Sequence, residues 1–186
     1  RAVFNNIQKF VSFQLACNLA ELIILFVGVL LAPIFGWQVP IITAIQILFM
    51  NLVTDSIPAV TLGFNPTSPD IMLAKPRGSG GGNIILNKFT IGTLIFAGTL
   101  MALFSLLANY FSFNLWHQSQ TQAATTTVAA LICVEVISAF TFRSFRKPVL
   151  SRSPFVNMPL LWAAVGSVLV TLVIIYTPLS GFFETT

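Results

Sequence analysis

The chain has 186 residues, of which 56% are hydrophobic and only 8% are charged. Soluble globular domains carry roughly 25% charged residues, so this composition excludes an ordinary soluble domain and indicates a membrane protein with the lipid bilayer as its partner. The formal net charge of +4 is explained by the membrane topology inferred below, and it gives no reason to expect a nucleic-acid partner.

Long, uninterrupted apolar stretches follow one another along the chain. Each is long enough to cross the hydrocarbon core as a helix, which takes roughly 20 residues. A membrane β-barrel would instead show segments of about 10 residues with alternating polarity, whereas runs such as residues 22–32 are continuously apolar. The sequence therefore predicts an all-α, polytopic transmembrane helical bundle with about five spans, at residues 11–31, 41–64, 89–111, 123–142 and 159–176.

The basic residues indicate how the spans are oriented, because short loops rich in Lys and Arg stay in the cytoplasm. Loops 33–40 and 112–122 contain no Lys or Arg. We therefore expect a cytoplasmic N-terminus, an exoplasmic C-terminus, a cytoplasmic stalk at 1–10 and a cytoplasmic connector at 65–88, whose glycine-rich part is native or engineered. The 9 basic residues lie before the first span, between the second and third, and between the fourth and fifth: Arg1, Lys9, Lys75, Arg77, Lys88, Arg143, Arg146, Lys147 and Arg152.

Three of the 5 acidic residues, Glu21, Asp55 and Glu135, fall inside predicted spans. A carboxylate at the centre of a membrane helix costs at least ~2.5 kcal/mol on insertion scales, so such a residue is by default functional and faces the protein interior or an ion path. Glu135 has no basic residue near it in its own helix. It must therefore be protonated, paired with a group on another helix, or bound to a cation.

Polar residues accompany two of these acids at helical spacing. Asn18 lies three residues before Glu21, so their side chains project from one face of the first span and can share a ligand. Asn51 lies four residues before Asp55 and shares a face with it, whereas Thr54 points in another direction. Pro58 follows closely, and because its ring removes an N–H and clashes with the preceding turn, we expect the second span to be unwound near Asp55–Pro58.

Together these residues form a set of hard oxygen donors. Ca²⁺ takes six to eight oxygen ligands, and Mn²⁺ also suits such a set, whereas Cu(I) and Zn²⁺ favour sulfur or imidazole. Protonation of the emptied carboxylates offers counter-transport of H⁺ as a hypothesis. Cys17 and Cys133 lack a metal-binding or redox spacing and are interpreted as packing residues. The candidate ligands are Asn18, Glu21, Asn51, Thr54, Asp55 and Glu135.

Several segments resemble the P-type Ca²⁺-transporting ATPases. Residues 50–72, MNLVTDSIPAVTLGFNPTSPDIM, closely resemble the sixth membrane helix of that family and the loop after it. The opening RAVFNNIQKF and the later Asn18-Leu-Ala-Glu21 resemble its fifth helix and stalk, and CVEVISAF at 133–140 resembles the eighth. The resemblance covers essentially the whole chain, as helices five to nine.

The resemblance implies roles for particular residues. In pumps of the sarcoplasmic-reticulum type, the positions matching Asn18, Glu21, Thr54, Asp55 and Glu135 form one Ca²⁺ site, and those matching Asn51 and Asp55 contribute to a second. Glu135 favours a complete first site, because plasma-membrane pumps carry a non-acidic residue there. Na⁺/K⁺ pumps have a second acid where this chain has Asn51, which favours Ca²⁺ or Mn²⁺ over Na⁺ and K⁺.

The sequence lacks the DKTGT phosphorylation motif and the nucleotide-binding and actuator domains of that family. We therefore expect residues 1–186 to be a fragment, the C-terminal membrane domain of an ATP-driven Ca²⁺ pump, not catalytic alone. ATP and Mg²⁺ would act only through the absent domains, and the remaining domains and helices of the pump would be its partners. The alternatives are a secondary cation/H⁺ exchanger, for which an inverted repeat is missing, and a non-transporting membrane scaffold.

Overall fold

The structure is a computed structural model that describes residues 2–66, 86–144, 154–183 and 185. Every regular element in this described part is helical, and five helices are long and apolar enough to cross a membrane. The prediction of an all-α membrane bundle with about five spans is thus confirmed. The five candidate spans are Ala2–Phe35, Ala44–Leu62, Lys88–Leu115, Gln120–Phe142 and Met158–Tyr176.

Two of the spans are composite, because their backbone changes from α-helical to π-helical geometry. The second span consists of three segments, and the third ends in a π-helical turn. Two short 3-10 turns, η5 (Pro154–Val156) and η6 (Pro178–Gly181), flank the last span. The remaining elements are α1 (Ala2–Phe35), α2 (Ala44–Phe49), η1 (Met50–Asp55), α3 (Ser56–Leu62), α4 (Lys88–Tyr110), η3 (Phe111–Leu115), α5 (Gln120–Phe142) and α6 (Met158–Tyr176).

The sequence led us to expect that the second span is unwound near Asp55–Pro58. In the structure this part of the span is instead helical, with a widened π-helical turn. The chain stays helical through η1 and continues directly into α3, which contains Pro58 in its first turn. A π-turn is an alternative way to accommodate a missing N–H, and such turns occur often at functional sites. The hydroxyl of Ser56 donates to the carbonyl oxygen of Asn51, and that of Thr54 donates to Met50, so side chains also bond backbone carbonyls in this turn.

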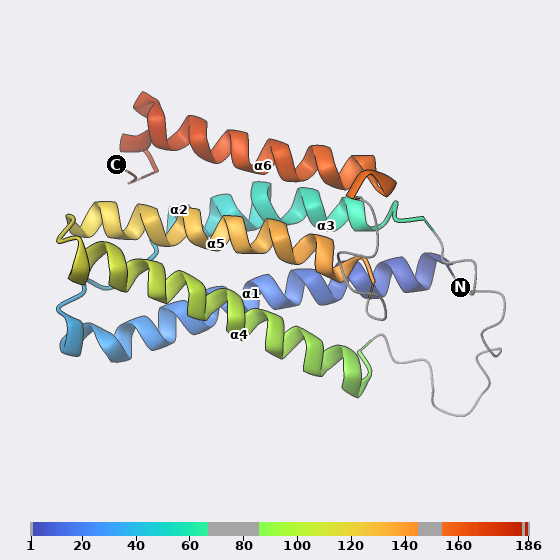
Figure 1. The fold of residues 1–186 in the computed structure, drawn as a ribbon, viewed down its shortest axis with the longest axis horizontal. Coiled ribbons are helices and arrows are strands. Elements are labelled where there is room, and N and C mark those ends of the chain that lie inside the picture. The colour runs from blue at the N-terminus through green and yellow to red at the C-terminus, as the bar shows by residue number, and fades with distance from the viewer. Residues whose placement is uncertain (1, 67–85, 145–153, 184, 186) are drawn as a thin grey trace.

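Figure 1 shows the helices side by side, with α6 along one edge of the bundle and α1 crossing α4 at the other. The most extensive helix contact is between α1 and α4, followed by that between α4 and α5. α5 also contacts α1, α3 and α6, so it lies in the middle of the bundle. Any polar residue on the inner face of α5 is therefore surrounded by other spans.

The core of the bundle allows close approach of its helices. The rings of Phe13 and Phe142 meet edge to face with centroids 5.9 Å apart, which joins α1 to α5. A methyl group added at Gly98 would lie 2.9 Å from the backbone oxygen of Ala16, so the close contact between α4 and α1 requires glycine. On the outer surface, Phe26, Phe96 and Trp162 are each at least 67% exposed, as side chains that face lipid are.

Asparagine side chains tie the helices together at the end of the bundle where α1 begins. Asn6 donates to the backbone oxygens of Gly63 and Asn65, both at 2.9 Å, and so links α1 to the end of α3. Asn65 donates to the backbone oxygen of Arg143, which follows α5, at 3.3 Å. The start of α1 is therefore hydrogen-bonded to the end of α3, which is in turn hydrogen-bonded to the end of α5.

The predicted stalk at 1–10 is continuous with the first span in α1, apart from Arg1, which lies outside the described residues. Most of the predicted connector at 65–88 also lies outside them, because the structure does not describe 67–85. The basic residues Lys75, Arg77, Arg146, Lys147 and Arg152 fall in the same category.

Candidate cation-binding site

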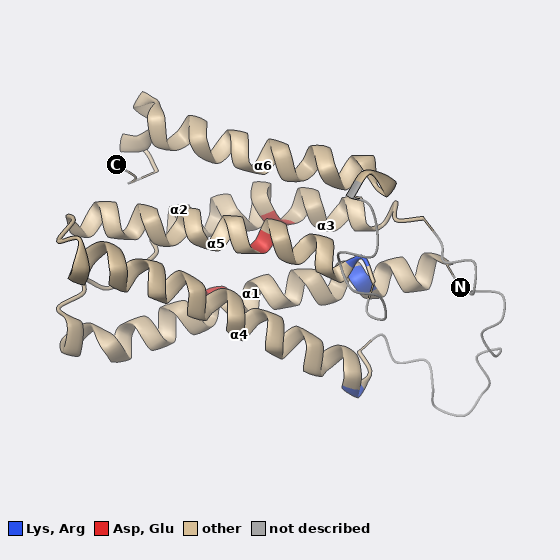
Figure 2. Cartoon of the chain, viewed as in Figure 1, with Lys and Arg blue, Asp and Glu red and all other residues tan. Residues whose placement is uncertain are grey.

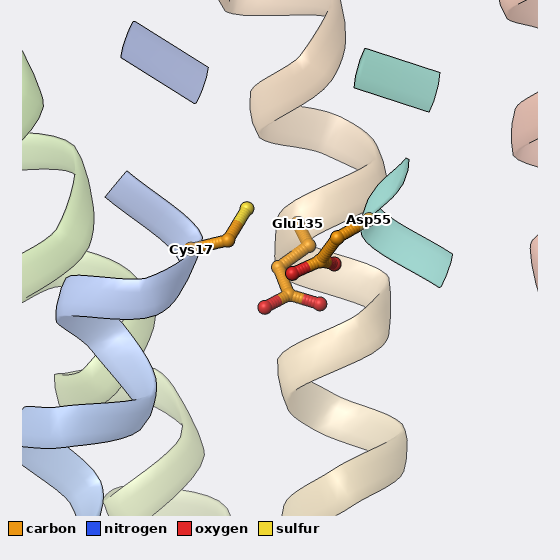
Figure 3. Close-up of side chains that lie close together, drawn as sticks. All are labelled: Cys17, Asp55 and Glu135. Carbon is orange, nitrogen blue, oxygen red and sulfur yellow. The ribbon is translucent and has the colours of Figure 1, made fainter. Parts of the chain in front are cut away.

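Two of the intramembrane acids come together in the middle of the bundle. Asp55 at the end of η1 and Glu135 in α5 are 0% and 1% exposed. One carboxylate oxygen from each, together with the sulfur of Cys17 in α1, lie within 4.8 Å of one another. Figure 3 shows the three side chains converging from three different elements, and Figure 2 shows the acidic residues midway along the helices.

The carboxylates of Asp55 and Glu135 are not hydrogen-bonded by the described part of the chain. All four of their oxygens are buried and lack a hydrogen-bond partner within the part of the chain that the structure describes. Buried polar atoms are almost always hydrogen-bonded, and an unpaired buried acid is costly. A bound cation would satisfy these oxygens and remove the repulsion between the two acids.

Glu21 lies one helical turn after Cys17 in α1 and is held by the side chain of Asn51. The amide nitrogen of Asn51 donates to both carboxylate oxygens of Glu21, at 2.9 and 2.8 Å, and it also lies 3.2 Å from the backbone oxygen of Ile47. Glu21 is only 5% exposed. This contact joins α1 to η1 and leaves the amide oxygen of Asn51 available as an acceptor.

The two remaining candidates differ in how they are engaged. The side-chain oxygen of Asn18 is buried and has no hydrogen-bond partner among the described residues. The hydroxyl of Thr54 is buried and donates to the backbone oxygen of Met50 at 3.0 Å. A hydroxyl that donates one hydrogen bond retains acceptor lone pairs, so Thr54 can still bind a cation through its oxygen.

Comparison with known proteins places the chain in a family. The family model described as "Cation transporting ATPase, C-terminus" matches residues 39–186, which include the second to fifth spans. The chain belongs to this family. Because the match extends from the second span to the last, it covers η1 and α5, and therefore the elements that carry Asp55 and Glu135 in this cation-transporting ATPase segment.

Individual relatives agree with this cation-transporting ATPase assignment. The chain is 33% identical over 186 residues to the calcium-transporting ATPase of Bacillus subtilis, covering 100% of this chain and 20% of the relative. It is 32% identical over 193 residues to calcium-transporting ATPase 1 of Bacillus cereus, covering 96% and 21%. With the endoplasmic reticulum calcium ATPase srcA of Aspergillus fumigatus the identity is 25% over 206 residues, covering 96% and 21%. The chain thus spans about a fifth of the length of these relatives.

The structure of this cation-transporting ATPase segment separates the predicted ligands into two groups. Asp55 and Glu135 lie together, whereas Glu21 and Asn51 form a hydrogen-bonded pair. Asn51 therefore pairs across helices as well as sharing its own helix with Asp55.

Cys17, interpreted from its sequence pattern as a packing residue, lies in the acid cluster. Cys17 is fully buried, as a packing residue would be, but its sulfur lies beside two carboxylates rather than only apolar groups. A signal was present, since Cys17 lies four residues before Glu21 and therefore on the same helical face. Cys133, in contrast, is exposed and outside the cluster, although it is close to Glu135 in sequence.

Proposed function

We propose that this chain is the cation-binding membrane domain, residues 1–186, of an ATP-driven Ca²⁺ pump. Its ligands are Asn18, Glu21, Asn51, Thr54, Asp55 and Glu135. The observation that carries the proposal is the convergence of the carboxylates of Asp55 and Glu135, buried and without hydrogen-bond partners among the described residues, in the middle of a membrane bundle. Ionisable residues inside a membrane bundle are costly and mark ion pathways, so two such acids in this position favour a cation site.

The chemistry of the donors supports Ca²⁺ as the transported ion. Carboxylate, amide and hydroxyl oxygens are hard ligands, and Ca²⁺ takes six to eight of them at about 2.3–2.6 Å. Two ligands on opposite sides of one Ca²⁺ are therefore up to about 5 Å apart, and the 4.8 Å limit of the cluster is within that range. The relatives named as calcium-transporting ATPases support the same ion, and Mn²⁺ is the second candidate.

The distribution of ligands over helices supports coupling to a distant reaction. α1 runs without interruption from Ala2 past Asn18 and Glu21, while the other ligands lie on η1 and α5. A force applied at the start of α1 would shift two ligands relative to the other four. Hydrolysis of ATP with Mg²⁺ would take place in other domains of the longer pump, which are the partners of this chain together with the lipid bilayer.

The positions of the basic residues support a cytoplasmic N-terminus and an exoplasmic C-terminus. Lys9 lies in the early part of α1, Lys88 begins α4, and Arg143 follows α5. Figure 1 shows these three helix ends on the same side of the bundle, and Figure 2 shows the basic residues toward that side. Under the positive-inside rule, this side faces the cytoplasm.

The test is phosphorylation of the full-length protein by radiolabelled ATP. Wild-type protein forms a phosphorylated intermediate only when Ca²⁺ is present, and Asp55→Asn abolishes this Ca²⁺-dependent phosphorylation. Ser105→Ala is the matched control, because Ser105 is buried in α4 and donates to the backbone oxygen of Met101 within its own helix. Normal phosphorylation of Asp55→Asn at ordinary Ca²⁺ contradicts the proposal. Transport without a phosphorylated intermediate supports the exchanger. Phosphorylation that is stimulated by Mn²⁺ but not by Ca²⁺ identifies Mn²⁺ as the transported ion.

A further inference from the structure

Cys17 brings a donor of a different chemical kind to the acid cluster. Its side chain is 0% exposed, and Figure 3 shows it on the side of α1 that faces Glu135 and Asp55. The sulfur and one oxygen of each acid lie within 4.8 Å of one another. The acid oxygens lack hydrogen-bond partners among the described residues, so they are available to bind the same metal ion as the sulfur.

We propose that the sulfur of Cys17 is a metal ligand, and that this site therefore also binds large, thiophilic divalent cations, with Cd²⁺ as the probe. The inference rests on the proposed function for the ligand roles of Asp55 and Glu135. It adds a ligand and a class of cation to that function. Thiolate ligands favour soft cations, whereas carboxylates favour hard ones, so a mixed set accepts both kinds.

The size of the cluster favours a cation as large as Ca²⁺ over the smaller Zn²⁺. Zn²⁺ holds sulfur at about 2.3 Å and oxygen at about 2.0–2.2 Å in tetrahedral geometry, which places ligand atoms roughly 3.6 Å apart. The atoms of this cluster are up to 4.8 Å apart. Zn²⁺ would require these ligand atoms to move closer together, whereas Cd²⁺ is close to Ca²⁺ in size and also binds sulfur well.

The two cysteines of the chain provide a matched pair of variants. Cys17→Ser replaces sulfur by a hard oxygen with little change in volume. Cys133→Ser makes the same change on α5, at an exposed position two residues from Glu135 in sequence. The experiment measures equilibrium binding of Cd²⁺ and of Ca²⁺ to the purified full-length protein. It also measures the sulfur-to-cadmium charge-transfer absorption, which is lost when Ca²⁺ displaces Cd²⁺ from the site.

The expected result is a selective loss. Cys17→Ser removes the displaceable absorption and weakens Cd²⁺ binding by at least roughly tenfold, a loss that removal of even an outer-shell partner can cause. Ca²⁺ affinity changes by no more than about twofold, because Ca²⁺ gains little from sulfur. Cys133→Ser leaves both affinities and the absorption as in wild type. Retained Ca²⁺ binding in Cys17→Ser also shows that the variant is folded.

Other outcomes separate this inference from the proposed function. If Cys17→Ser binds Cd²⁺ as wild type does, or loses Cd²⁺ and Ca²⁺ in parallel, Cys17 is a packing residue and the inference is wrong while the function stands. If wild type binds Cd²⁺ through Cys17 but does not bind Ca²⁺, the inference stands and the function is wrong. Should Cys17→Ser fail to fold, the test is made on Cys133→Ser loaded with Cd²⁺. A sulfur-to-cadmium absorption that disappears when Ca²⁺ is added supports the inference, and the lack of such an absorption overturns it.

Discussion

The side-chain nitrogen of Asn51 donates to both carboxylate oxygens of Glu21, at 2.9 and 2.8 Å. This contact connects the π-turn of the second span to α1. Both residues are candidate ligands, so the contact holds two parts of the proposed site in a fixed relation. It also gives a buried acid two charge-assisted hydrogen bonds, which are stronger than neutral ones.

A double-mutant cycle between Glu21 and Asn51 measures this contact. Glu21→Ala and Asn51→Ala should show a coupling of about 1.5–3 kcal/mol in the free energy of unfolding, as expected for hydrogen bonds to a charged group. The measurement is denaturant unfolding of the purified full-length protein with Ca²⁺ chelated. The cycle of Glu21 with Ser105→Ala is the control and should be additive within about 0.5 kcal/mol. Additive effects for Glu21 and Asn51 would show that the contact contributes nothing.

Glu135→Gln should change stability and ion affinity in opposite directions. Removing one of two close, unpaired acids relieves repulsion in the ion-free protein, so its melting temperature in chelator should rise. The loss of a charged ligand should weaken Ca²⁺ binding, so the increase in melting temperature on adding Ca²⁺ should shrink. Thermal unfolding with chelator and with Ca²⁺ measures both effects. A variant that is less stable in chelator and gains as much from Ca²⁺ as wild type contradicts the account.

Gly98→Ala and Gly92→Ala test the close contact between α1 and α4. Both glycines lie inside α4, but a methyl group at Gly98 meets the backbone of Ala16, whereas one at Gly92 meets nothing within 4 Å. Gly98→Ala should destabilise the protein by about 1–3 kcal/mol through overpacking. Gly92→Ala should stabilise it by up to about 1 kcal/mol through helix propensity. Equal effects of the two substitutions in denaturant unfolding would argue against this packing.

The fold could be predicted from the sequence because membrane spans depend on local hydropathy. The apolar runs gave the number of spans, and only their ends differed: α1, for example, begins at Ala2 rather than near residue 11. The response of the chain to Pro58 could not be predicted in the same way. A missing N–H can be accommodated by an unwound or a widened turn, and the hydrogen bonds from Ser56 and Thr54 accompany the widened one.

The part of the site that could be predicted from the sequence is the set of acids, because a charge inside a membrane span is energetically costly. That cost marks Asp55 and Glu135, which the structure places together. The neighbours of an acid depend on how the helices rotate against each other, which spacing within one helix does not determine. Sequence therefore did not reveal that Asn51 pairs with Glu21. It did not establish the position of Cys17 either: Cys17 shares a helical face with Glu21, but a cysteine in an apolar run is also typical of a packing residue.

The most direct test of the central claim is equilibrium binding of radioactive Ca²⁺ to the full-length protein without ATP. It asks whether the acid cluster itself holds the ion, independently of any phosphorylation. The account predicts saturable binding by wild type and by Ser105→Ala, and a loss of affinity of roughly a hundredfold or more for Asp55→Asn, the cost expected when a buried ligand loses its charge. Wild-type affinity in Asp55→Asn would contradict it.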